Sequence, residues 1–131
     1  MMKKTFLLLT MAATILTACH ENLEERAQRE AREYTKKYCP TPYTNNTRTD
    51  SVTFDMATKT YHYYCTIMGP MDDVQVIRDH HKQLYDGLAT ALAENTAIKV
   101  YRDAGYRFAY TIRSAKQPSQ VLFEEIFTTK K

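Results

Sequence analysis

Cysteine and histidine are the side chains of this sequence whose types and spacing are most open to a chemical interpretation. The chain has Cys19, Cys39 and Cys65 and four histidines, of which His80 and His81 are adjacent. It contains no nucleophile elbow, phosphate loop, zinc-type cysteine pair or His-Glu-x-x-His motif, and three glycines are too few for a glycine-rich phosphate cradle. Catalysis needs two or three polar groups that converge in one pocket. The sequence therefore predicts a protein that is not an enzyme and has no cofactor or metal.

His81 is the histidine that falls on the apolar stripe of a predicted helix. Adjacent helical residues point about 100° apart, so His80 and His81 cannot easily hold one metal from the helix alone. We interpret His81 as a ring that packs against a sheet. The alternative is a small-ligand, metal or haem carrier, or a minor envelope enzyme, that uses His81 at the helix–sheet edge with a third ligand such as His62.

A second pattern is found near the N-terminus. Two lysines are followed by a short apolar run, and this run ends in Leu16-Thr17-Ala18-Cys19. The run is too short for a permanent membrane-spanning helix, which needs about 20 residues, but it has the parts of a secretory signal. The tetrapeptide resembles the lipobox of bacterial lipoproteins. This resemblance implies cleavage before the cysteine, a lipid on its thiol and firm membrane anchoring by several acyl chains.

The lipobox sets the expected domains and location. We expect a lipoprotein signal peptide over residues 1–18 and a single domain over residues 19–131. His20 follows the cysteine, and the absence of aspartate there resembles the sorting pattern of outer-membrane lipoproteins in Gram-negative bacteria. We expect a lipid-anchored protein of the bacterial cell envelope, at the outer membrane, with its periplasmic and surface sides both left open.

The charge balance bears on the class of partner. The chain has 18 Lys and Arg against 15 Asp and Glu, and its net charge is +3. Two of those lysines lie in the expected signal peptide, so the remaining domain is close to neutral. Nucleic-acid binding proteins carry a clustered basic face, which is not seen here. The composition therefore excludes nucleic acid as the expected partner.

Cys39 and Cys65 remain once Cys19 is assigned to the lipid. An even pair of cysteines in an oxidising compartment predicts a disulfide. In the chain-entropy description, such a crosslink stabilises the fold by roughly 3 kcal/mol. The alternative is two buried free thiols.

Hydrophobic periodicity predicts two helices and four strands. One helix is expected over 22–38, where Asn22 and Glu25 have the spacing of an N-terminal capping box, and a second helix over 74–94. Residues 97–104 fit either a helical or an extended segment. Alternation of apolar and polar residues predicts the strands, which are 51–56, 61–68, 106–113 and 121–127.

The element order predicts an α+β fold. The order α-β-β-α-β-β is most simply satisfied by a four-stranded antiparallel sheet with two helices packed on one face. This order, together with the run Ala104-Gly105-Tyr106-Arg107-Phe108, resembles small lipid-anchored α+β domains of uncharacterised Bacteroidetes families. The resemblance carries no known active site to this chain.

The sheet face turned away from the helices is the predicted binding surface. Alternation places His62, Tyr64, Arg107 and Arg113 on it, and tyrosine and arginine among apolar residues are typical of binding surfaces. The alternative is a partly solvated sheet face, which antiparallel sheets commonly have. The sequence thus predicts a membrane-anchored, non-enzymatic interaction module for a protein or glycan partner. Asp50-Ser51-Val52 also resembles an O-glycosylation acceptor of Bacteroidetes.

The disulfide can be tested by thermal unfolding. We expect Cys39→Ser to lower the Tm by as much as reduction lowers that of the unchanged protein, because both open the same crosslink. Circular dichroism with and without reductant measures both values. Equal melting of the unchanged protein under the two conditions would contradict the disulfide.

Overall fold

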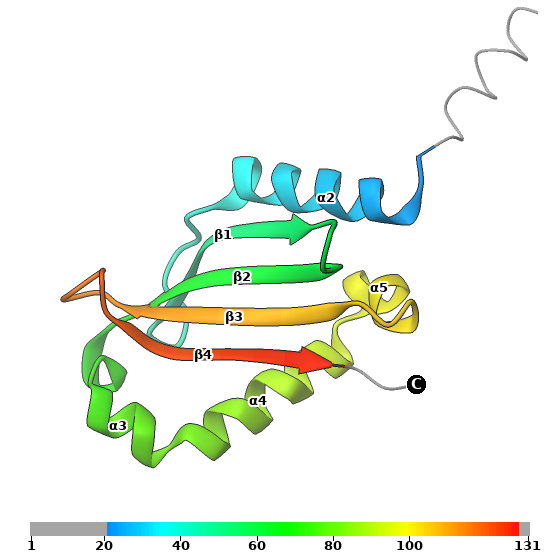
Figure 1. Cartoon of the computed structure of the whole chain (residues 1–131). Coiled ribbons are helices and arrows are strands. Elements are labelled where there is room, and N and C mark those ends of the chain that lie inside the picture. The colour runs from blue at the N-terminus through cyan, green and yellow to red at the C-terminus, as the bar shows by residue number, and fades with distance from the viewer. Residues whose placement is uncertain (1–20, 129–131) are drawn as a thin grey trace, which may run out of the picture.

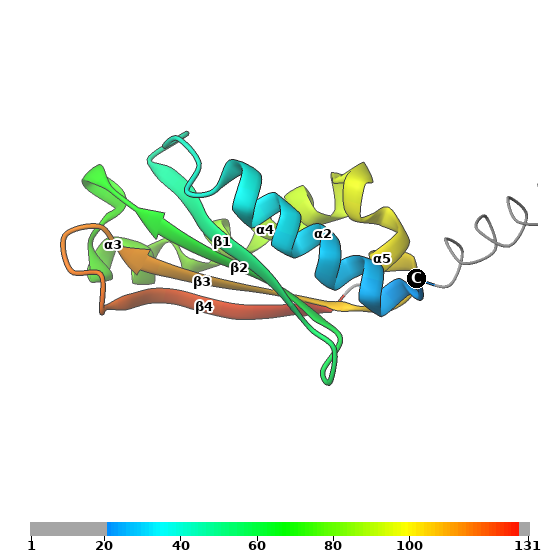
Figure 2. The ribbon, with the colours of Figure 1, turned by 90° about the horizontal axis from the view of Figure 1, so that it is seen from above.

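The computed structural model describes residues 21–128, which form one four-stranded sheet with helices on one of its faces (Figure 1, Figure 2). The expected signal peptide and Cys19 lie outside these residues. Over the described part of the chain, no helix has the length and apolar character needed to cross a membrane. The elements in chain order are α2 (Leu23–Tyr38), β1 (Thr47–Asp55), β2 (Thr60–Ile67), η1 (Gly69–Met71), α3 (Val74–Asp79), α4 (His81–Glu94), η2 (Thr96–Ile98), α5 (Lys99–Asp103), β3 (Arg107–Ser114) and β4 (Val121–Thr128).

Helix α2 confirms the first predicted helix and its cap. The Asn22 side chain accepts a hydrogen bond from the Glu25 amide, and the Glu25 carboxylate accepts one from the Asn22 amide. Both bonds satisfy amides that the first helical turn leaves without partners. Ala27 and Ala31 are buried, and their small side chains let the helix approach β1 closely. The helix ends at Tyr38, and Cys39 caps it before Pro40.

A threonine in α2 hydrogen-bonds to backbone groups on the outer edge of β1. The Thr35 hydroxyl donates to the carbonyl of Val52 and accepts from its amide, each at 2.8 Å. Beyond the helix, Thr41 makes the same kind of pair with Thr49, through its amide at 2.9 Å and its hydroxyl at 3.0 Å. An edge strand normally presents unpaired backbone groups. On β1 the outward groups of Thr49 and Val52 are already bonded.

The predicted purely antiparallel sheet is wrong. The strand order is β1-β2-β3-β4, and β2 pairs with β3 in parallel while the two outer pairs are antiparallel. The physical reason is the segment between β2 and β3, which runs back along the sheet through α3, α4 and α5 before β3 begins (Figure 1). The chain then enters β3 beside the start of β2, where the Arg107 amide donates to the Lys59 carbonyl at 2.9 Å.

The helical part of the prediction also needs correction. The predicted helix over 74–94 is two helices, α3 and α4, which meet at His80. Residues 97–104, left open by the sequence, are largely helical, in η2 and α5. The order α-β-β-α-β-β is therefore not matched, whereas the α+β class and the four strands are correct. Figure 2 shows α2, α4 and α5 on the same side of the sheet.

Aromatic residues dominate the core between the helices and the sheet. Phe108 is fully buried near the start of β3. The parallel pairing sets Tyr63 of β2 against Tyr110 of β3 with nearly parallel rings, 4.8 Å between centroids. Cys65 is buried in the same layer and Cys39 is half-buried, and both thiols are free in the structure. The disulfide between them stays a prediction.

The double hydrogen bond of Thr35 generates a stability prediction. Thr35→Val keeps the shape of the side chain but leaves the amide and carbonyl of Val52 without their partner, so we expect unfolding free energy to fall by about 1–3 kcal/mol. Urea unfolding followed by circular dichroism measures the change. Thr35→Ser is the matched control, because it keeps the hydroxyl. Equal stability of the valine and serine variants would contradict the role of this hydroxyl.

Candidate functional site

The uncovered face of the sheet brings together three of the four predicted binding residues. His62 and Tyr64 of β2 and Arg107 of β3 line a depression of about 650 Å³. The rings of His62 and Tyr64 are stacked, with 4.0 Å between centroids and an angle of 8° between planes. Arg113 lies on the same face but outside this depression, and its guanidinium reaches the Pro118 carbonyl at 3.5 Å.

A polar relay crosses three strands on this face. Nε2 of His62 lies 2.8 Å from Oγ1 of Thr111, and that hydroxyl donates to Glu124 at 2.8 Å. A threonine hydroxyl carries one proton, so it must accept from His62, and Nε2 is the protonated nitrogen of the ring. Burial lowers the pKa of His62, and the Glu124 charge partly opposes this shift. The sequence could not show this relay, because only the strand register brings the three residues together.

His81 lies on the opposite face of the sheet from His62. Its Nε2 is 3.3 Å from a Glu125 oxygen, and its ring packs against Phe123 at 5.2 Å between centroids. This confirms the interpretation of His81 as a ring packed on the sheet. The suggested third ligand His62 does not approach it. Within residues 21–128, no three histidine, cysteine or acidic side chains are grouped in a way that could hold a metal ion.

A second recess lies on the helix-covered face, and we call it the tyrosine groove. It has a volume of about 450 Å³ between α2 on one side and the η2–α5 corner on the other, above β1 and β2. Tyr34 and Tyr38 of α2 are 41% and 52% exposed, so both rings present apolar surface to solvent beside this recess. The other residues that define the groove are Val52, Tyr61, Tyr63, Ile98 and Tyr101, with Arg29, Glu33 and Lys37 at the rim.

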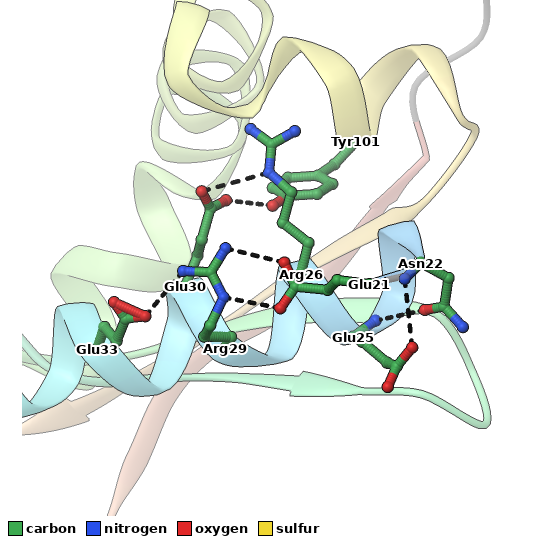
Figure 3. A network of polar contacts seen from close by, with 8 residues as sticks. All are labelled: Glu21, Asn22, Glu25, Arg26, Arg29, Glu30, Glu33 and Tyr101. Carbon is green, nitrogen blue, oxygen red and sulfur yellow. Dashed lines mark hydrogen bonds and ion pairs between the residues drawn. The ribbon is translucent and has the colours of Figure 1, made fainter. Parts of the chain in front are cut away.

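A network of charged residues holds the two walls of the tyrosine groove together (Figure 3). The Tyr101 hydroxyl donates to Glu30, and Nε of Arg26 lies 3.4 Å from the other oxygen of that carboxylate. The Arg26 guanidinium also lies over the Tyr101 ring, 5.9 Å from its centroid. Arg29 at the rim contacts Glu33 at 2.8 Å. These contacts join α5 to α2 and fix the position of the rim charges.

Three tyrosine hydroxyls in the groove are unused donors. Burial raises the pKa of Tyr61 to about 12 and also raises the pKa of Tyr34 and Tyr63. All three phenols therefore keep their protons at physiological pH. None of the three hydroxyls hydrogen-bonds to another residue within the described chain. Each can donate to an acceptor that enters the groove.

The sequence analysis missed this groove for a physical reason. The periodic stripe of α2 includes Tyr34 and Tyr38, and such a stripe is normally core. The structure instead leaves both rings beside an opening, because the opposite wall comes from α5, a segment whose structure the sequence left open. The available signal was the residue type, since tyrosine rather than leucine occupies the last two positions of the stripe.

The relay on the open face generates a pH prediction. Because the pKa of His62 is lowered below its ordinary value of 6.5, the unfolded chain binds the proton more readily. Stability should therefore fall as pH drops below about 6.5 and level off below the folded pKa. We expect Glu124→Gln to lower the pKa of His62 further, because it removes the charge that opposes the burial effect.

NMR titration of the imidazole signals measures this pKa. Glu125→Gln is the matched control, since that carboxylate contacts His81 on the other face. A His62 pKa at or above 6.5, or one that rises in Glu124→Gln, would contradict the interpretation.

Three solved structures are similar to this chain. A Pseudomonas aeruginosa protein predicted to be secreted has a TM-score of 0.67 and 14% identity over 80% of this chain and 88% of its own. The pilotin EpsS of the Vibrio vulnificus type 2 secretion system has a TM-score of 0.61 and 14% identity, over 82% and 88%. The Vibrio cholerae type II secretion pilotin AspS has a TM-score of 0.62 and 16% identity, over 82% and 90%. At these identities the likeness shows a shared fold.

Comparison of the sequence with known families gives a further result. No curated protein matches the chain. The model of one family, described as a domain of unknown function, DUF8479, matches residues 22–123. The match begins at the capping residue of α2 and ends at Phe123 in β4, so it includes both walls of the tyrosine groove, and His62 and Thr111 of the relay but not Glu124. This protein belongs to the DUF8479 family.

Proposed function

We propose that this protein is a non-enzymatic interaction module, held at the bacterial outer membrane by a lipid on Cys19, that binds a protein partner in the tyrosine groove. The observation that carries the proposal is the pair of exposed rings, Tyr34 and Tyr38, above the unused hydroxyls of Tyr61 and Tyr63. The fold that it shares with two type II secretion pilotins supports an assembly role in the envelope rather than catalysis.

The chemistry of the groove favours a peptide segment as the ligand. Tyrosine contributes a large apolar ring with little loss of conformational entropy, and it is enriched among the residues that dominate binding energy. The phenols offer donors to backbone carbonyls, while Val52 and Ile98 offer apolar contact. Arg29, Glu33 and Lys37 at the rim bring both signs of charge, which adds specificity more than affinity.

The open sheet face is a second candidate surface. Its depression combines the stacked rings of His62 and Tyr64 with Arg107, as a site for a polar ligand such as a glycan requires. The groups of the relay are, however, already bonded to one another. We therefore rank this surface, with Arg113 at its end, below the tyrosine groove.

Pull-down from native membranes tests both surfaces at once. We expect the double change Tyr34→Ala, Tyr38→Ala to abolish recovery of a partner that the unchanged protein retains, because it removes one wall of the groove. Tyr43→Ala is the matched control, since Tyr43 is a similarly exposed tyrosine outside the groove. Tyr64→Ala with Arg107→Glu removes the open-face candidate.

The outcomes separate the alternatives. Loss with the groove variant alone supports the proposal, and loss with the open-face variant alone transfers the function to that surface. Cys19→Ala should release the protein from membranes while leaving the groove intact, and its persistence in the membrane fraction would contradict the lipid anchor.

A further inference from the structure

We infer that the outer edge of β4 accepts an extended segment of a partner protein as a fifth strand, with basic side chains of that segment on the open sheet face. This inference is independent of the tyrosine groove, which lies over the other half of the sheet. It rests on three observations, namely the direction of the β4 backbone groups, the closure of the opposite edge, and the charges that β4 presents.

The register shows which backbone groups of β4 are free. Arg107 and Ala115 donate to carbonyls of the chain at either end of β2, so odd-numbered residues of β3 bond toward β2. Backbone direction alternates along a strand, and the even-numbered residues of β3 therefore bond toward β4. Their partners are Phe123, Glu125 and Phe127.

It follows that the amides and carbonyls of Glu124, Ile126 and Thr128 point away from the sheet. Within the described chain, no side chain or loop donates to these groups or accepts from them.

The two edges of the sheet differ in whether their outward backbone groups are hydrogen-bonded. Natural sheets protect their edges with charged side chains, bulges or a covering element. On β1 the outward groups of Val52 bond to the Thr35 hydroxyl, and those of Thr49 bond to the hydroxyl and amide of Thr41. On β4 the equivalent groups have no hydrogen-bond partner within the described chain, and the exposed side chains there include Ile126, at 53% the most exposed large apolar residue of the described chain.

Helix α4 lies beside this edge and can offer an apolar contact to an added strand. In Figure 1 it runs along the far side of β4 from β3, and Figure 2 places it on the helix-covered side. Only Leu92 of its fourteen residues is buried, whereas Leu84 and Leu88 are half-buried. A strand added to β4 would lie next to this helix, and its inward side chains would cover apolar surface that is now partly exposed.

The charges of β4 favour a basic partner over a second copy of this chain. Two β4 strands paired antiparallel around a twofold axis place Glu124 opposite Glu124, or Glu125 opposite Glu125, in the registers centred on those residues. Because Val121–Thr128 contains no lysine or arginine, no other register sets a basic side chain opposite either glutamate. Like charges directly opposite one another destabilise strand pairing. A segment with lysine or arginine beside Glu124 gains attraction at the same position. The occupant is therefore an extended segment that alternates basic and apolar side chains.

Amide hydrogen exchange by NMR tests the proposal, with a synthetic peptide of alternating lysine and valine, as long as β4, as the probe. In the free protein the amides of Glu124 and Ile126 should exchange faster than those of Glu125 and Phe127. On addition of the peptide the two fast amides should become protected. The same peptide with an N-methylated backbone keeps its charge but cannot donate to β4, so it should give no protection.

Two variants separate backbone pairing from simple charge attraction. Ile126→Pro removes an outward amide without breaking a bond to β3, and it should abolish peptide binding, whereas Ile126→Ser should retain it. Glu124→Gln should weaken Kd roughly fivefold, the factor that corresponds to about 1 kcal/mol of cross-strand attraction. Tyr38→Ala should leave peptide binding unchanged, which keeps this test distinct from that of the groove.

Three results would overturn the inference. The first is that the N-methylated peptide binds as tightly as the unmethylated one. This result can be obtained even if Ile126→Pro does not fold. The second is protection of Glu124 and Ile126 in the free protein at every concentration. The third is protection that rises with protein concentration and without peptide, which would assign the edge to a second copy of the chain.

Discussion

The parallel pairing of β2 with β3 is the constraint on which the rest of the structure depends. Two parallel neighbours require a crossover between them, and here it carries α3, α4 and α5 over the same face that α2 covers. Because α2 occupies the β1 side and the end of the crossover, η2 and α5, returns toward β2, these two walls leave the tyrosine groove between them. The crossover also leaves the other face of the sheet without a covering layer.

The two faces differ in how their polar groups are satisfied. On the open face, His62, Thr111 and Glu124 bond to one another, so the relay stabilises the sheet by itself. In the tyrosine groove, the hydroxyls of Tyr61 and Tyr63 have no hydrogen-bond acceptor within the described chain. Partly buried donors gain more from a ligand than donors that already have partners. This difference, rather than the size of either recess, ranks the groove first.

Local features of the fold could be predicted from the sequence, and long-range ones could not. The α2 cap follows from Asn22 and Glu25, and the inward and outward faces of β2 follow from alternation. The direction of β3 depends on the path of a long connection, which no local pattern encodes. His62 and Arg107 could be assigned to one face before their register was known, whereas the partnership of Thr111 with Glu124 required it. Tyr101 was missed because its helix is too short to show a period.

The closed edge at β1 also limits the stoichiometry of any assembly built through the sheet. A sheet with two open edges can add strands at both ends and grow without limit, as fibrils do. With Thr35 and Thr41 bonded to Val52 and Thr49 at the β1 edge, the proposed addition at β4 would leave this domain at the end of such a stack. Two threonine hydroxyls would then separate a discrete complex from a polymer.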